Sequence, residues 1–195
     1  MLLENIKELS DEEIFLKIQE NPELLSEIID RYKNKLDNFL KKISNFSKDE
    51  RDDILQEVFI TIYQKYFYFE KGQKFSSWIY QITHRKMIDY WRKNKKRDKD
   101  ISIEDNLTFV ESRFWKNEIE EELEMIENQE LLKKLFSKLP LKYKEIFILR
   151  FEEEKSYEEI AEILKIPISS VGTLISRAKK KLKEEYQKLT KNNYE

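Results

Sequence analysis

The stretch IPISSVGTLISRAKKKLK, residues 166–183, joins small hydroxyl residues to a dense run of cations. Hydroxyl groups can hydrogen-bond to bases or phosphates, and lysine and arginine neutralise phosphates. Small side chains, and the missing side chain of Gly172, would let this segment come close to a polyanion. The residue types therefore indicate nucleic-acid binding rather than the making or breaking of covalent bonds.

Few residues in the chain could carry enzymatic chemistry. There is one histidine, His84, within a basic segment, and there is no cysteine. We find no glycine-rich phosphate loop, no Ser-His-Asp set and no Glu-x-x-His metal pattern. The many glutamates follow helix-capping and solvated-face patterns instead. We therefore expect no catalytic residue, no metal site and no cofactor, and we interpret His84 as a DNA-side or surface residue.

The net charge of −2 hides a strong segregation of charge. Residues 85–99 contain eight basic and two acidic side chains, residues 104–130 two basic and ten acidic, and residues 177–191 seven basic and two acidic. Two basic segments with an acidic one between them suggest two polyanion-binding surfaces and an acidic spacer. Lysine- and glutamate-rich helices can also be ordinary solvated faces, so charge alone leaves both interpretations open.

Composition favours an all-α chain, because two glycines and three prolines are too few for the many tight turns of a β-protein. The segment MLLENIKELSDEE is too short and too acidic for a signal peptide. No apolar run approaches the roughly 20 residues that span a bilayer. We expect a soluble, cytoplasmic protein without membrane insertion.

Four helix starts are marked by local chemistry. Ser10, Ser47 and Ser156 each precede a glutamate by three residues, which is the spacing of a capping box. Asn21 stands before Pro22, whose missing N–H costs nothing at the first helical position. Apolar residues then recur at helical spacing in two helices: Leu25, Ile28, Ile29, Tyr32, Leu36, Phe39, Leu40 and Ile43 in the first, and Ile54, Leu55, Val58, Phe59, Ile62, Tyr63, Tyr66 and Phe67 in the second.

A third helix begins near Ser76, after a turn at Gly72, and changes character along its length. Trp78 and Ile82 lie on one stripe, which continues as Arg85, Asp89, Arg92 and Lys96. One end of this helix should face a core and the other a polyanion. We therefore predict two small helical domains, with an N-terminal domain at 1–97, an acidic linker at 98–127 and a C-terminal domain at 128–195.

The C-terminal domain is predicted to contain a helix-turn-helix. Tyr157, Ile160, Ala161 and Leu164 would form the buried face of its first helix, Pro167 would prevent that helix from continuing, and Ser169 or Ser170 would cap the second. On the second helix, Val171, Leu174 or Ile175, Ala178 and Leu182 should face inward. Ser170, Thr173, Arg177, Lys180 and Lys181 should face outward, toward a major groove. The alternative is a helical hairpin with a solvated basic tail.

Two blocks of the sequence resemble a known family. LPLKYKEIFILRFEEEKSYEEIAEILKIPISSVGTLISRAKKKLK closely resembles region 4 of the bacterial sigma-70 transcription factors. DDILQEVFITIYQKY followed by FSSWIYQITHRKMIDYWRKNKK is similar to region 2. Their order and spacing resemble the extracytoplasmic-function group, over residues 22–97 and 129–188.

The resemblance implies a sigma factor that binds core RNA polymerase, recognises the −10 and −35 promoter elements and promotes DNA melting. Contact with the β′ clamp helices is implied for Asp53, Gln56, Glu57 and Phe59. Binding of the −10 element is implied for Lys74, Ser76, Ser77, Arg85, Asp89, Arg92 and Lys93. Binding of the −35 element is implied for Ser170, Thr173, Leu174 and Arg177, with Lys180 and Lys181 over the DNA backbone. The helix in LPLKYKEIFILRF would dock on the β flap, and an anti-sigma partner stays open.

The chain departs from the family pattern at three positions. Members often carry asparagine where Arg85 stands, and lysine and arginine where Gly172 and Leu174 stand. The loss of two cations puts the strength and sequence of upstream recognition in question. Two other classes stay open at this point: a stand-alone helix-turn-helix regulator with a sensory N-terminal domain, and an adaptor that uses the aromatic run YFYF at residues 66–69. We interpret that run as mostly core, with an interface as the alternative for its final residues.

Overall fold

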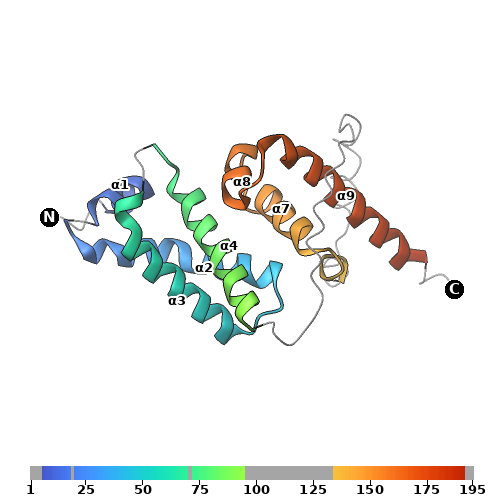
Figure 1. Cartoon of the computed structure of the whole chain (residues 1–195), viewed down its shortest axis with the longest axis horizontal. Helices are drawn as coiled ribbons and strands as arrows, with labels where there is room; N and C mark the ends of the chain where they lie inside the picture. Colours follow the sequence, from blue (N-terminus) through green and yellow to red (C-terminus); the bar gives the residue numbers. More distant parts are fainter. Residues whose placement is uncertain (1–5, 19, 70–71, 95–133, 192–195) are drawn as a thin grey trace. The chain divides into compact units, whose positions relative to one another are not determined.

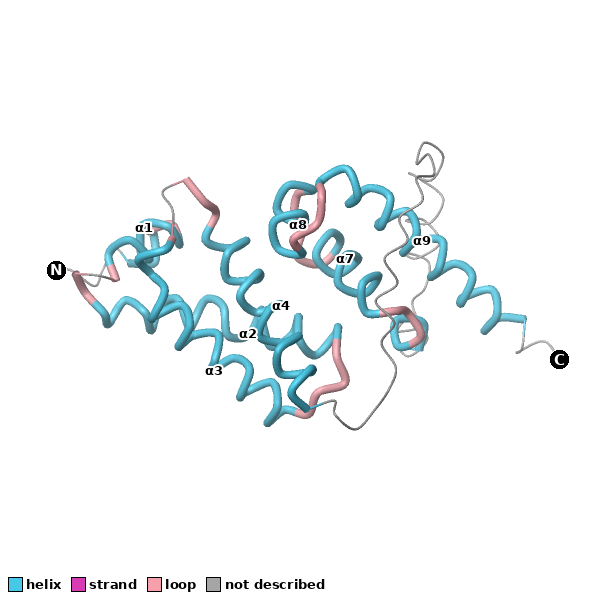
Figure 2. Tube along the Cα trace, viewed as in Figure 1, coloured by secondary structure: helices cyan, strands magenta, loops and turns pink. Residues whose placement is uncertain are grey.

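A computed structural model describes residues 6–18, 20–69, 72–94 and 134–191. Every regular element among these residues is a helix, so the prediction of an all-α chain is confirmed (Figures 1 and 2). The chain forms two compact units. We describe them separately as the N-terminal unit, residues 6–94, and the C-terminal unit, residues 134–191. The acidic linker proposed from the sequence lies outside the described residues.

In the N-terminal unit, the long helix α3 packs against both α2 and α4, and the short helix α1 also packs against α2 and α4. The elements are η1 (Ile6–Glu8), α1 (Asp11–Lys17), η2 (Pro22–Leu24), α2 (Leu25–Ile43), α3 (Lys48–Lys65), η3 (Tyr66–Tyr68) and α4 (Phe75–Asn94). None of the described helices combines the length and the apolar character needed to cross a bilayer.

The predicted helix starts are confirmed at atomic detail. Ser10, Ser47 and Ser156 each form a complete capping box, in which the serine N–H donates to the glutamate carboxylate at 2.8 Å and the serine hydroxyl accepts from the glutamate N–H. Asn21 accepts from the Glu23 N–H at 3.2 Å and starts η2, with Pro22 in its first turn. Local sequence thus fixes where four of the helical segments begin.

An aromatic cluster holds α1 and the start of α4 together. The Phe15 ring of α1 lies 4.7 Å from Phe75, 5.2 Å from Phe69 and 5.3 Å from Trp78, measured between ring centroids. Glu12 of α1 also accepts a hydrogen bond from the Phe75 N–H at 2.8 Å, which satisfies one of the free amides at the start of α4. These contacts determine where α4 enters the bundle.

Arg31 of α2 ties the beginning of the described chain to the bundle. Its guanidinium donates to Asp11 and Glu27, both at 2.8 Å, and to the backbone carbonyl oxygens of Leu9 and Ile6. Tyr32 donates its hydroxyl proton to Asp11, and burial followed by this hydrogen bond raises the pKa of Tyr32. Hydrogen bonds to charged groups contribute more than neutral ones, so this cluster fixes η1 and α1 against α2.

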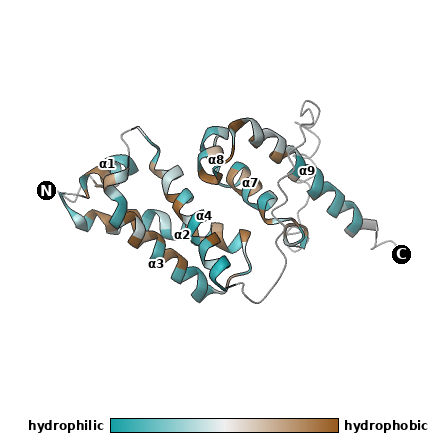
Figure 3. Cartoon of the chain, in the orientation of Figure 1, coloured by the Kyte–Doolittle hydropathy of each residue, from teal (hydrophilic) through white to brown (hydrophobic). Residues whose placement is uncertain are grey.

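The C-terminal unit contains α7 (Leu141–Phe151), α8 (Tyr157–Leu164) and α9 (Ile168–Lys191), preceded by a helical turn at residues 134–137. Helix α7 packs against α9. The core of the C-terminal unit contains Leu135, Leu139, Phe147 and Leu182, with Phe136, Phe151 and Tyr186 packed beside them. Figure 3 shows that α9 becomes hydrophilic toward its end, where the lysines are concentrated.

The turn between α8 and α9 confirms the helix-turn-helix connection and corrects two details. Lys165 ends α8 in the left-handed conformation at φ 55°, and α9 begins at Ile168, directly after Pro167. Ser169 and Ser170 therefore lie inside the first turn of α9, and the prediction that one of them caps it is wrong. Of the residues expected on the buried face of α8, Ile160 is fully buried, Ala161 and Leu164 are only partly buried, and Tyr157 is 41% exposed. Ile163, which we did not include, is fully buried.

The inward face of α9 is otherwise as predicted. Val171, Ala178 and Leu182 are fully buried, and between Leu174 and Ile175 it is Ile175 that faces the core, at 6% exposure. This burial fixes the rotation of α9 about its own axis. Leu174 is only partly buried and stays on the open side.

Gly172 gives a first testable prediction about α9. Glycine inside a helix is less stable than alanine by about 0.5–1 kcal/mol. A Cβ at Gly172 would meet the Tyr157 ring at 3.5 Å, an ordinary contact. Gly172→Ala should therefore raise the free energy of unfolding by about 0.5–1 kcal/mol, measured by denaturant unfolding of the full chain.

Gly72→Ala is the matched control. Gly72 has open space around it but a φ of 99°, which an L side chain rarely adopts. Its replacement should destabilise the N-terminal unit by about 1 kcal/mol or more. Equal effects of the two substitutions would contradict this account of the glycines.

Candidate polymerase and nucleic-acid interfaces

The predicted polymerase-binding side chains lie on the open side of α3. Asp53, Gln56 and Glu57 are exposed, and Phe59 is half-buried. The opposite side of the helix is in the core, where Ile54, Val58 and Ile62 are almost fully buried. The structure thus presents the four residues on one helix, at the surface, between α2 and α4.

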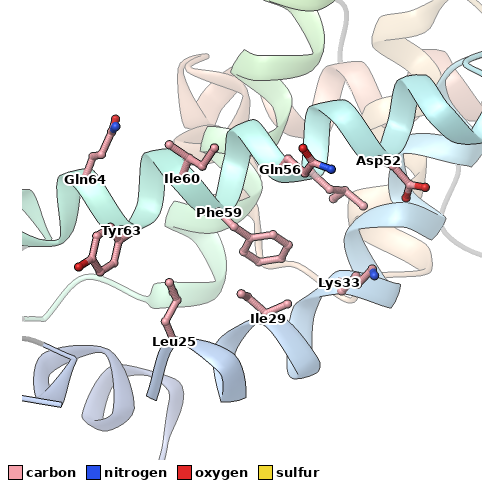
Figure 4. Close-up of a pocket in the computed structure, with 10 residues that line it drawn as sticks. Leu25, Ile29, Lys33, Asp52, Gln56, Phe59, Ile60, Tyr63 and Gln64 are labelled. Atoms are coloured by element: carbon pink, nitrogen blue, oxygen red, sulfur yellow. The ribbon is translucent and has the colours of Figure 1, made fainter. Parts of the chain in front are cut away.

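An apolar groove of about 690 Å³ runs between α2 and α3. Figure 4 shows the Phe59 ring pointing from α3 toward Ile29 of α2, with Gln56 and Lys33 toward one end of the groove. Ile60 and Tyr63, also in its lining, are 51% and 47% exposed. The remaining lining residues are Leu25, Asp52, Leu55 and Gln64.

This groove shows that apolar spacing and burial differ in α2 and α3. Leu25, Ile29 and Tyr63 follow the apolar spacing of the two helices. Leu25 and Ile29 are only partly buried, and Tyr63 is exposed. Helical periodicity identifies an apolar stripe, but it does not tell which edge of that stripe another helix will cover.

On its other side, α3 is joined to α4 by an ion pair. Glu57 accepts a hydrogen bond from Lys86 at 2.9 Å. That hydrogen bond, followed by the positive charges of Lys86 and Lys93, holds the pKa of Glu57 below its ordinary value of 4.5. The family resemblance implies a polymerase contact for Glu57 and a DNA contact for Lys93, and both residues line one shallow groove of about 390 Å³.

A second groove between α3 and α4, of about 530 Å³, contains Arg85 and Asp89 of the predicted −10 set. Trp78 and Ile82, which also line it, are largely buried. Arg85 and Asp89 are one helical turn apart, with Nε of Arg85 4.0 Å from Oδ2 of Asp89. Most of each side chain is exposed. We call this the Arg85 groove. Its other lining residues are Thr61, Gln64, Lys65, Tyr68, Gln81 and Lys86.

Tyr68 is a site residue that sequence reasoning missed. The run YFYF was expected to lie mostly in a core, but Phe67 and Tyr68 are 70% and 76% exposed, and Phe69 alone is buried, at 8%. Tyr68 lines the Arg85 groove, whereas Phe67 does not. An aromatic residue just before the turn at Gly72 is a signal that could have been used, because stacking on exposed rings is a common means of holding unpaired bases.

The other members of the predicted −10 set differ in exposure. Lys74, Arg92 and Lys93 are exposed, and Ser76 is partly buried. Ser77 is fully buried. The expectation that the Ser77 hydroxyl lies on the surface is therefore wrong for this structure, and Ser77 is not retained as a DNA contact.

On α9, the predicted −35 residues share the side away from the core. Lys180 is exposed, while Ser170, Thr173, Leu174, Arg177 and Lys181 are partly exposed. Lys181 pairs with Glu184 at 3.5 Å. One cation of the basic tail differs from its neighbours, because Lys179 is 6% exposed, with its ammonium nitrogen 4.8 Å from the centre of the Phe151 ring. The basic segment is thus partly a packing surface.

Helix α7, for which the family resemblance implies docking on the β flap, begins after Pro140 and buries Ile146, Ile148 and Leu149. Lys142 is exposed, and Tyr143 and Lys144 are partly exposed. Burial lowers the pKa of Lys144. Within the part of the chain that the structure describes, no three metal-ligating side chains are grouped.

Comparison with known proteins identifies the two units. Residues 28–97 match the family model for sigma-70 region 2, and residues 129–182 match the model for sigma-70, region 4. The chain is 30% identical over 168 residues to the ECF RNA polymerase sigma factor SigW of Bacillus subtilis, covering 84% of this chain and 89% of SigW. It is 28% identical over 164 residues to the ECF RNA polymerase sigma factor SigM of the same organism, covering 84% and 96%.

Two solved structures have a similar fold. One is CnrH in complex with the cytosolic domain of CnrY, with a TM-score of 0.63, 19% identity and coverage of 89% of this chain and 95% of that chain. The other is the sigma factor RpoE in complex with the anti-sigma factor NepR from Bartonella quintana, with a TM-score of 0.57, 20% identity and coverage of 83% and 96%. The region 2 match over residues 28–97 also argues against a sensory N-terminal domain.

The ion pair between α3 and α4 gives a prediction about charge. Lys86→Met should raise the pKa of Glu57 toward 4.5, because the hydrogen bond and the nearest positive charge are removed together. The pKa of the carboxyl can be followed by NMR titration of the full chain. Because the folded pKa of Glu57 is depressed, the Lys86 contact stabilises the fold at higher pH and is lost as pH falls through that pKa, below 4.5.

Glu13 is an internal control for this titration. Its pKa is also lowered, by the backbone and side-chain hydrogen bonds of Ser10 in a capping box. It should not respond to Lys86→Met. A shift of both carboxyls would show a general change of fold, and no shift of Glu57 would show that the ion pair does not form in solution.

Proposed function

The chain belongs to the sigma-70 family of RNA polymerase sigma factors, in its extracytoplasmic-function group, and from this we propose how its surfaces divide the work of transcription initiation. The N-terminal unit binds core RNA polymerase on one side of α3 and melted promoter DNA on the other. The C-terminal unit binds the upstream promoter element through α9. The corresponding domains are 1–97 and 128–195, with 98–127 as the linker.

One observation carries this proposal: α3 has a groove of different chemistry on each flank. The groove shared with α2 is apolar, with Phe59, Ile60 and Tyr63 in its lining. The Arg85 groove, shared with α4, combines exposed charge with aromatic rings. The first suits a protein surface and the second suits a nucleic acid, so one helix can hold both partners at once.

The apolar groove has the composition of a protein interface. Partly exposed aromatic and aliphatic side chains in its centre and polar groups at its rim match the usual pattern of a buried interface core and a wet edge. Phe59 fits an anchor role, since truncation of aromatic anchors often costs 2 kcal/mol or more. Gln56 stands at the rim, where an amide can hydrogen-bond to a partner helix. We assign this groove to the β′ clamp of the polymerase, and to any anti-sigma factor that competes with it.

The Arg85 groove suits an unpaired base. Tyr68 offers an exposed ring for stacking, which contributes about 1–3 kcal/mol per base. Asp89 can accept a hydrogen bond from an exocyclic amine, and Arg85 can donate to a base edge or a phosphate. Arg92 and Lys93, further along α4, continue the cationic track for the DNA backbone. Extrusion of a base costs only a few kcal/mol, so this set of contacts is of the required size.

The C-terminal unit supplies the upstream contact. In a helix-turn-helix the second helix lies in the major groove with its N-terminal residues against the base edges. The first nine residues of α9 would then face bases, and Arg177, Lys180 and Lys181 would lie nearer the phosphates. We propose that α7 docks on the β flap.

The covalent chemistry of transcription belongs to the polymerase, so the chain acts as a non-enzymatic factor without a cofactor, in the cytoplasm where the polymerase works.

Tyr68 and Phe67 form a matched pair for testing the DNA side. Both are exposed aromatics in η3, but only Tyr68 lines the Arg85 groove. Tyr68→Ala should reduce open-complex formation by about tenfold, the size of one lost stacking contact, as measured by permanganate footprinting of the holoenzyme. Phe67→Ala should leave melting unchanged, and neither should alter the affinity for core polymerase. Equal loss in both variants would refute the assignment of the groove.

Gln56 and Arg177 test the two units against each other. Gln56→Ala should weaken binding to core polymerase and lower run-off transcription from every promoter alike. Arg177→Ala should keep core binding and reduce transcription from promoters that depend on the upstream element, because the loss of a phosphate contact weakens the binding of α9 to that element. Phe59→Ala can be added once circular dichroism shows it folded, since that ring is half-buried. If Arg177→Ala loses core binding while Gln56→Ala keeps it, the assignment of the two surfaces is wrong.

A further inference from the structure

The first nine residues of α9 contain no cation. Residues 168–176 carry no charged side chain and no asparagine or glutamine, and Arg177 is the first basic residue of the helix. In a helix-turn-helix this is the part that meets the base edges. The reading of bases there must therefore use hydroxyl groups, methyl groups and aliphatic carbon.

The structure narrows the residues that can do this. Val171 and Ile175 are held in the core, so they are not available to DNA. Gly172 has no side chain and lies against the Tyr157 ring of α8. Ser169, Ser170 and Ser176 are accessible, but they offer hydroxyl groups and no methyl. Ile168 is 49% exposed, but its spacing places it on the same side of the helix as Val171 and Ile175. Thr173 and Leu174 are the accessible residues with methyl groups on the open side, adjacent in sequence and both partly exposed. Each presents methyl groups, and Thr173 adds one hydroxyl.

Base chemistry then points to one pyrimidine. Guanine is read best by a forked pair of bonds from arginine or lysine, and adenine by asparagine or glutamine. None of these four residue types occurs at 168–176. The C5-methyl of thymine is the base feature in the major groove that is read by apolar contact, with threonine methyl groups among the usual partners.

We infer that Thr173 and Leu174 read the C5-methyl groups of thymines in the upstream promoter element. This inference rests on the proposed function of α9 and adds to it the class of base that the helix selects. Arg177, Lys180 and Lys181 supply affinity through phosphates, which carry no sequence information directly. The preference of the helix for its site then comes mainly from methyl contacts.

Replacement of thymine by deoxyuridine tests the inference, because it removes only the C5-methyl. The holoenzyme is formed with the full chain and bound to a promoter whose transcription needs the upstream element. All thymines of that element are replaced by deoxyuridine, and the downstream element is unchanged. We expect binding to weaken about fourfold for each methyl that is in contact, which corresponds to about 0.8 kcal/mol per buried methyl-sized group.

Two protein variants locate the contact. Thr173→Ser removes one methyl and keeps the hydroxyl, and Leu174→Ala removes the branched end of the side chain. In each variant the ratio of affinities for thymine and deoxyuridine promoters should fall toward one. Lys180→Ala is the matched control on the same helix, and it should weaken binding to both promoters by the same factor and leave the ratio unchanged. Circular dichroism of each variant confirms that α9 is folded.

Three results would overturn the inference. The wild-type holoenzyme could bind both promoters equally, which shows that no methyl is read. The promoters could differ by a ratio that neither Thr173→Ser nor Leu174→Ala reduces, which shows that DNA shape rather than methyl contact is sensed. The third result is that transcription by the wild-type holoenzyme does not depend on the upstream element and that Arg177→Ala does not reduce it. That result contradicts the proposed function of α9 itself, and the first two leave it intact.

Discussion

The burial of one stripe of α3 is the constraint on which the rest of the N-terminal unit depends. Ile54, Val58 and Ile62 are at most 1% exposed, so α3 cannot rotate without breaking the core. With that stripe fixed, the helix must show its two flanks to the grooves beside α2 and α4. The chemistry of the flanks then decides what each groove can bind. The apolar groove and the Arg85 groove are thus two consequences of the same packing, and a change in the rotation of α3 would alter both.

Local chemistry made some of this structure predictable from sequence. A capping box needs only a serine and a glutamate three residues apart, and all three boxes form as expected. The left-handed residue that ends α8 was harder to predict, since Lys165 rather than glycine occupies it. The start of α9 was misplaced because proline can open a helix as well as prevent one from continuing. Ser169 therefore looked like a cap although it already lies in the first turn.

Contacts between helices decide which apolar side chains are buried, and the sequence pattern alone does not predict them. The run from Tyr66 to Phe69 contains four aromatic residues, and only contact with Phe15, Phe75 and Trp78 selects Phe69 for the core. Tyr68 is left at the surface by that selection. The same holds for the apolar stripe of α2, where Ile28 is buried and its neighbour Ile29 faces a groove. Periodicity gives the face of a helix, whereas the partner helix determines how far the core extends across that face.

If α9 reads bases mainly through methyl contacts, it discriminates weakly between upstream sequences. Weak discrimination is compatible with two small modules that bind DNA together. A methyl contact contributes less than a forked arginine contact to guanine, so α9 by itself would select its site poorly. In the proposed arrangement, polymerase holds the N-terminal unit and a base enters the Arg85 groove, so the second module binds at a high effective concentration. A modest preference for thymine methyls is then sufficient, because α9 has to discriminate only among the few sequences that lie within its reach.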